Sequence, residues 1–84
     1  MNPSQRKLYK EIDKLLWEEW NPIGGFVPED EYQSYVPAIL RLKMQNADEQ
    51  TIARKLFEYE TISMGLSGSW EGCMEIAKRV LELE

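Results

Sequence analysis

The sequence contains no histidine and only one cysteine, Cys73. Without histidine, no catalytic triad of the Ser-His-Asp or Cys-His kind can be built, because the usual general base is missing. A single thiol excludes an intramolecular disulfide and, without histidine, a zinc site. We expect Cys73 to be a buried apolar residue, and the alternative is a thiol activated near the start of the last helix. We expect no cofactor.

Long apolar runs and an excess of basic residues are also missing. No run approaches the ~18 apolar residues of a membrane-spanning helix, and the start of the chain lacks the apolar region of a signal peptide. The expected location is therefore cytoplasmic. Ten Lys and Arg against fifteen Asp and Glu give a net charge of −5, which repels phosphate backbones. The one basic cluster, Arg6, Lys7 and Lys10, is interleaved with acids. We expect binding to neither nucleic acid nor membrane.

What is present is a helical pattern over almost the whole chain. Apolar residues recur at three- and four-residue steps in four segments, and no stretch alternates with period two. The segments are 4–20, 29–45, 48–64 and 70–83. Their short connections predict an all-α fold, a compact irregular four-helix bundle in a single domain spanning 1–84.

Capping residues predict where these helices begin and end. Ser4 and Ser69 are placed to cap the first and last helices. The third helix has two candidates: Asn46, which with Glu49 resembles a capping box, and less clearly Asp48 with Thr51. Gly65 followed by apolar Leu66 is typical of a Schellman ending for that helix.

The second helix contains a proline in its pattern. Pro28 suits a first-turn position, and the acidic residues that follow it complement the helix dipole. Pro37 lies further along, where it removes a hydrogen bond and clashes with the preceding turn. Either the helix is kinked there, which we favour, or it begins near Ser34 and Pro37 falls in its first turn.

Between the first and second helices lies an unusual segment, residues 20–28, which we call the elbow. Pro22 should drive Asn21 out of the helical region and end the first helix. Gly24 and Gly25 permit a sharp turn through positive φ. The apolar residues of the elbow should fold back on the core; these are Ile23, Phe26 and Val27.

The tryptophans and the helix charges give two further expectations. Trp17, Trp20 and Trp70 should be core residues in so small a domain, and the alternative is that one of them lines a partner-binding groove. The first helix starts basic with Arg6 and Lys7, and the last ends acidic with Glu82 and Glu84. Antiparallel packing of these two helices would relieve both unfavourable dipole interactions.

Three short motifs together resemble a small bacterial family, the YugE-like domain of unknown function. They are Trp20-Asn21-Pro22-Ile23-Gly24, Asp30-Glu31-Tyr32 and Met64-Gly65-Leu66. The resemblance spans about residues 8–81. It implies a compact helical fold in a bacterial cytoplasm and carries no activity over to this chain.

These observations favour a non-enzymatic module that binds another protein, with the partner and oligomeric state open. The expected partner-binding residues lie in the elbow and the acidic stretch after it: Trp20, Asn21, Pro22, Gly24, Glu29, Asp30, Glu31 and Tyr32. One alternative is a divalent-cation-dependent hydrolase that uses the carboxylates flanking the elbow, although a solvated acidic rim explains them more simply. A second alternative is a toxin-neutralising, immunity-type protein, suggested by small size and acidity alone.

Overall fold

The first helix is capped by Asn2, the residue that precedes Pro3. The structure, a computed structural model, describes residues 2–25 and 27–83. Helix α1 spans Pro3–Leu15, and the Asn2 side chain accepts a 2.8 Å hydrogen bond from the Gln5 backbone N–H. Gln5 returns the bond to the Asn2 N–H at 3.2 Å, which completes a capping box. Ser4 is therefore not the cap, because Pro3 already fills a first-turn position and moves the helix start upstream.

The first helical run ends in a wider turn. Residues Leu16–Trp20 form a π-helical segment, η1, directly after α1. Asn21 then leaves the right-handed helical region, as Pro22 requires, but its φ of +27° lies on the left-handed side and not in the extended region typical before proline. Its backbone N–H still donates to the Leu16 carbonyl at 2.9 Å. The predicted end of the first helix at Trp20 is confirmed.

The second helix starts later than its acidic residues suggest. Residues 29–32 form turns, a short 3₁₀ segment η2 covers Gln33–Tyr35, and α2 spans Val36–Met44. A helix starting at Pro28, with a kink at Pro37, is therefore wrong. Pro37 lies in the first turn of α2, where its missing N–H costs no helical hydrogen bond. The alternative start near Ser34 is confirmed.

Helices α3 and α4 form the second half. Helix α3 spans Glu49–Glu58 and continues as a π-helical segment η3, Tyr59–Ser63; α4 spans Trp70–Glu82. The Asp48 side chain caps α3 by accepting a 2.8 Å bond from the Thr51 N–H. Asn46 is not the cap, since its φ of +60° places it in the preceding turn. Ser69 caps α4, as predicted.

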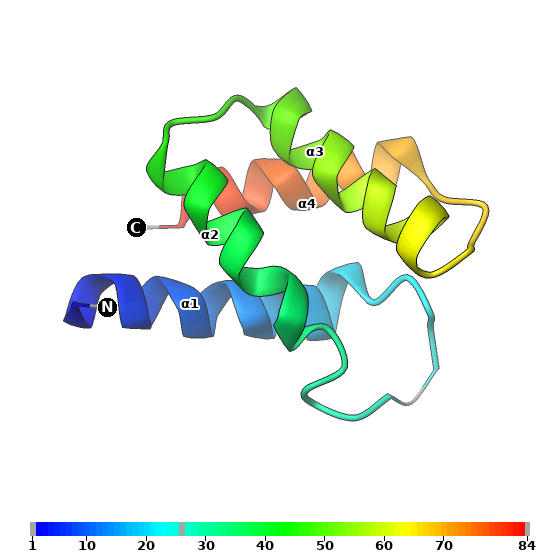
Figure 1. The fold of residues 1–84 in the computed structure, drawn as a ribbon, viewed down its shortest axis with the longest axis horizontal. Helices are drawn as coiled ribbons and strands as arrows, with labels where there is room; N and C mark the ends of the chain where they lie inside the picture. The colour runs from blue at the N-terminus through cyan, green and yellow to red at the C-terminus, as the bar shows by residue number, and fades with distance from the viewer. Residues whose placement is uncertain (1, 26, 84) are drawn as a thin grey trace.

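The helices pack as an all-α, four-helix arrangement, and the described residues contain no strand. Helices α3 and α4 pack against each other as one pair, α1 runs beneath them, and α2 crosses α1 (Figure 1). Buried side chains from all four helices fill the centre, among them Ile12, Ile39, Leu56 and Val80. Among the described residues, no helix is both long and apolar enough to cross a membrane.

Helices α1 and α4 run in opposite directions, as the helix charges predict (Figure 1). The expected pairing of the basic start with the acidic end is not how they are joined. Arg79 of α4 instead binds the Glu19 carboxylate at the end of the first helical run, and lies 3.6 Å from Glu75. Within residues 2–25 and 27–83, no ion pair links Arg6 or Lys7 to Glu82, and Glu84 lies outside the described residues.

Candidate functional site

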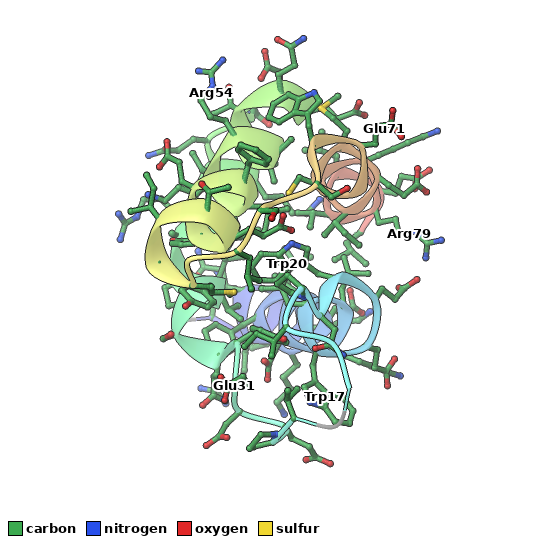
Figure 2. The ribbon with its side chains drawn as sticks, turned by 90° about the vertical axis from the view of Figure 1, so that its right-hand side faces the viewer. Trp17, Trp20, Glu31, Arg54, Glu71 and Arg79 are labelled. Atoms are coloured by element: carbon green, nitrogen blue, oxygen red, sulfur yellow. The ribbon has the colours of Figure 1, made fainter. Side chains whose placement is uncertain are left out.

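The two π-helical segments meet at one contact in the centre of the molecule. Segment η1 ends at Trp20, and η3 contains Glu60. The Trp20 indole Nε1–H donates a 2.7 Å hydrogen bond to Glu60 Oε2. A π-helical turn accommodates one more residue than an α-helical turn and is frequent at functional sites, where it redirects side chains. Figure 2 shows Trp20 pointing between the α3–α4 pair and the first helix.

Glu60 is a buried carboxylate surrounded by donors. Its exposed fraction is 4 %, and it accepts three hydrogen bonds. Besides Trp20, the Cys73 thiol donates to Oε2 at 3.2 Å, and the Ser69 backbone N–H donates to Oε1 at 2.8 Å. These bonds offset the cost of removing a charged group from water. We call Glu60 with Trp20, Ser69 and Cys73 the Glu60 cluster; it ties together η1, η3 and the start of α4.

The sequence reasoning missed Glu60, although a signal for it exists. Glu60 follows Ile52 and Leu56 at four-residue steps, and both of these are fully buried. A glutamate on the apolar stripe of an amphipathic helix must either face solvent or find buried donors. Two of its donors, Trp20 and Cys73, are distant in sequence, so the stripe alone does not reveal which outcome applies.

Cys73 is fully buried, as predicted. Burial first, and then the Glu60 carboxylate by accepting the thiol hydrogen and through its charge, together raise the pKa of the thiol from the ordinary 9.0 to about 12. The thiol is therefore a donor to Glu60 at neutral pH and not a nucleophile.

We expect Cys73 to react with thiol reagents only when the fold opens. A pKa of about 12 in place of 9.0 lowers the thiolate fraction at pH 8 roughly a thousandfold, and burial blocks access as well. Reaction with a chromogenic disulfide reagent should be at least that much slower in buffer than in concentrated urea. Comparable rates in the two solutions would show that the thiol is exposed and contradict this description of the cluster.

The elbow is held by a tyrosine beneath it. Tyr32 is fully buried, and its hydroxyl donates a 2.6 Å bond to Asn21 Oδ1. The same hydroxyl oxygen accepts the Ile23 backbone N–H at 3.3 Å. Asn21 Nδ2 donates to the Gly25 carbonyl at 3.4 Å, so its amide serves the turn itself. Gly24 and Gly25 have φ of +77° and +68°, as predicted.

The expectation for the apolar elbow residues is only partly right. Val27 packs against the core, and its carbonyl accepts a 3.1 Å bond from the half-buried Trp17 indole. Ile23 is 46 % exposed, which contradicts the prediction that it folds inward; the buried Tyr32 side chain occupies the space beneath it. Phe26 lies outside the described residues.

The three tryptophans also differ in how far they are buried. Trp20 is buried and packs on Tyr32 with ring centroids 5.3 Å apart. Trp17 is half-buried at the edge of the core. Trp70 is 42 % exposed and lies edge-on to Phe57 at 5.9 Å, so its assignment to the core is wrong. Trp70 is the first residue of α4, so it lies at the start of that helix.

The eight predicted partner-binding residues differ in burial. Trp20 and Tyr32 are buried and support the elbow from inside. Asn21 and Pro22 are half-buried, whereas the glycine and the acidic residues are exposed; these are Gly24, Glu29, Asp30 and Glu31. In Figure 2, Trp20 lies centrally and Glu31 at the periphery. A partner would contact the elbow backbone and the acidic stretch directly. Trp20 and Tyr32 lie beneath that surface and would support it without contacting the partner.

Two depressions flank Leu66. The first, which we call the elbow hollow, has a volume of about 390 Å³ and is lined by Ile23, Glu31, Tyr35 and Met64 as well as Leu66. The second, which we call the Glu60 cleft, has a volume of about 520 Å³. Its lining includes Glu19, Trp20, Pro22, Glu60, Leu66 and Glu75. Leu66 therefore lines both depressions, and the elbow hollow has one carboxylate in its lining whereas the Glu60 cleft has three.

The acidic stretch after the elbow lies near α1. Burial raises the pKa of the Asp13 carboxyl above its usual 3.8, the Gln33 side chain lowers it, and the charges of Asp30 and Glu29 raise it. Even so, in the part of the chain that the structure describes, no group of three or more His, Cys, Asp or Glu side chains is placed to hold a metal ion. A cation-dependent hydrolase would need such a group.

Comparison of the chain with protein-family models, with curated proteins and with solved structures found no match in any of the three. The resemblance to the YugE-like family therefore stays a prediction from the three motifs. The function proposed below is argued from this chain's own residues.

Proposed function

We propose that this protein is a non-enzymatic module that binds another protein through the elbow hollow and the acidic stretch beside it. The observation that carries the proposal is the pairing of two exposed apolar side chains, Ile23 at 46 % and Leu66 at 36 %, on the wall of one hollow. Apolar residues at the centre of a surface and charged residues around it are typical of protein interfaces.

The shape of the hollow is supported from beneath by buried contacts. Tyr32 and Tyr35 line it, and both rings contact Trp20, at centroid separations of 5.3 and 6.0 Å. Tyr35 also packs on Tyr59 at 4.3 Å. Rigid aromatic residues lose little conformational entropy on binding, so a hollow built on them is pre-organised for a partner.

The rim of the hollow indicates what the partner carries. Glu31 lines the hollow, and Glu29 and Asp30, which directly precede it in the sequence, are exposed. With a net charge of −5 on the chain, the facing surface of the partner should be basic around an apolar residue. The single free thiol suits a reducing compartment, and we place the protein in the cytoplasm.

The test is a selection of peptides from a displayed random library against the immobilised full chain. We expect the selected peptides to combine an apolar residue with Lys or Arg. Ile23→Asp should weaken their binding at least tenfold, about 1.4 kcal/mol, because it places a carboxylate in the apolar centre.

Met44→Asp is the matched control. Met44 is 48 % exposed, almost the same as Ile23, but it lies at the end of α2 that is remote from the elbow (Figure 1). Binding by this variant should stay within about twofold of the parent, and thermal unfolding should show that both variants are folded. Equal losses in the two variants, or peptides insensitive to Ile23→Asp, would contradict the proposal.

A further inference from the structure

The Glu60 cleft lies on the other side of Leu66 from the elbow hollow and differs from it in charge. Apolar groups form part of its wall, from Trp20, Pro22, Leu66 and Ile76. Three carboxylates also line it, those of Glu19, Glu60 and Glu75. Arg79 binds Glu19 and approaches Glu75, but it is half-exposed and is not part of the lining. In Figure 2 its side chain extends outward from α4. The cleft thus carries more negative charge than the chain itself neutralises.

Glu60 retains acceptor capacity that its own neighbours do not use. Oε2 accepts two hydrogen bonds, from Trp20 and Cys73, whereas Oε1 accepts one, from the Ser69 N–H. Each carboxylate oxygen has room for about two donors. Ser69, which donates to Oε1, also lines the cleft, whereas Cys73 does not; Oε1 is therefore the oxygen to which we assign a further donor from the cleft.

We propose that the Glu60 cleft receives a lysine side chain of the bound protein, with the ammonium group at Glu60 Oε1 and the methylene stem against Trp20 and Leu66. Lysine fits better than arginine because a guanidinium binds a carboxylate best through two parallel bonds, and Oε2 is already fully used. A lysine stem packs readily on apolar surface while its charge reaches a polar group. The inference rests on the proposed function for the source of the lysine.

The proposal can be tested without knowing the partner, by NMR titration of the isotope-labelled full chain. The probes are N-acetyl-lysine N-methylamide, its arginine analogue, and the norleucine analogue, which lacks the ammonium group. The lysine probe should cause saturable shifts of the Trp20 indole and Ser69 amide signals in the millimolar range. Its affinity should exceed that of the norleucine probe about tenfold and that of the arginine probe severalfold.

Two variants on the same face of α4 locate the binding. Glu75→Gln removes a carboxylate from the cleft and should weaken the lysine probe about threefold, whereas Glu71→Gln, one turn earlier and outside the lining, should leave it unchanged. Both residues are exposed, so both variants should fold. Equal shifts with the norleucine probe, no saturable shift with the lysine probe, or equal effects of the two variants would overturn the proposal.

The test of the Glu60 cleft can fail or succeed independently of the test of the elbow hollow. Ile23→Asp should weaken peptide binding at least tenfold and leave the lysine probe bound in the cleft, because Ile23 does not line the cleft. Loss of the lysine probe's binding in folded Ile23→Asp would contradict the separate site. If Ile23→Asp has no effect on peptides while the lysine probe binds, the elbow proposal fails and the cleft proposal stands as a site for a cationic side chain.

Discussion

Replacing Glu60 with alanine should lower the free energy of unfolding by about 3 kcal/mol, which is a large share of the total for a domain of this size. The reason is that two buried donors, the Trp20 indole N–H and the Cys73 thiol, lose their acceptor, as does the half-buried Ser69 backbone N–H. Each buried donor left without a partner costs about 1–3 kcal/mol. Urea unfolding followed by circular dichroism measures the change.

Glu58→Ala is the matched control for this experiment. Glu58 lies two residues away on α3, its side chain is 48 % exposed, and its one ion pair among the described residues, with Lys55 at 3.9 Å, is a surface contact within the helix. Its loss should cost at most about 0.5 kcal/mol. A double-mutant cycle of Glu60→Ala with Trp20→Phe should show a coupling of about 1 kcal/mol or more. Similar losses for Glu58→Ala and Glu60→Ala would show that the buried carboxylate contributes nothing special.

Gly68→Ala should destabilise the fold by about 3 kcal/mol, because both the backbone conformation and the space exclude a side chain. Gly68 has φ of +82°, and a Cβ there would lie 2.6 Å from Thr61 Cγ2 and 2.7 Å from Phe57 Cε1. A side chain at this position therefore forces Thr61 and Phe57 to shift, in addition to the strain of the positive φ. Because Gly68 also lines the Glu60 cleft, the substitution should change the shape of the cleft.

Gly65→Ala separates the cost of the backbone strain from the cost of the steric clash. Gly65 has a similar φ of +70°, but no atom lies within 4 Å of a Cβ built there. It should therefore cost only the conformational strain, about 1 kcal/mol. Thermal or urea unfolding of the two variants gives the comparison. Equal costs at positions 65 and 68 would mean that the close approach of the loop to Phe57 and Thr61 does not exist in solution.

How far the sequence predicts this fold depends on whether a signal is local. The stop at Pro22, the turn at Gly24 and Gly25 and the cap at Ser69 follow from neighbouring residues, and the structure confirms them. The helix starts that were placed wrongly had competing local candidates. Asn2 displaced Ser4, and Asp48 displaced Asn46, because each could bond a backbone N–H three residues on.

The ends of the helices show where the spacing of apolar residues fails to predict which residues are buried. Both α1 and α3 continue as π-helical segments, which rotate the residues that follow away from the 3.6-residue stripe. Ile62 is apolar and lies in η3, yet it is 78 % exposed. Glu60 in the same segment is buried. Nothing in the spacing of residues 59–63 alone distinguishes these outcomes.

The sequence selects a candidate surface but does not say which of its residues are exposed. Sequence reasoning selected the elbow, because proline, paired glycine and tryptophan crowd together there. It did not separate the residues that support the surface, Trp20 and Tyr32, from the residues that form it, such as Ile23 and Glu31. That distinction depends on Tyr32 reaching back across the turn to Asn21, a contact between side chains 11 positions apart.

The central claim is that Glu60 fixes the end of the first helical run by holding the Trp20 indole in the core. Native-state hydrogen exchange of the Trp20 indole N–H, followed by NMR, tests it most directly. The account predicts that this proton exchanges only through global unfolding, with the same free energy as the slowest core amides. Exchange as fast as that of free tryptophan would contradict it.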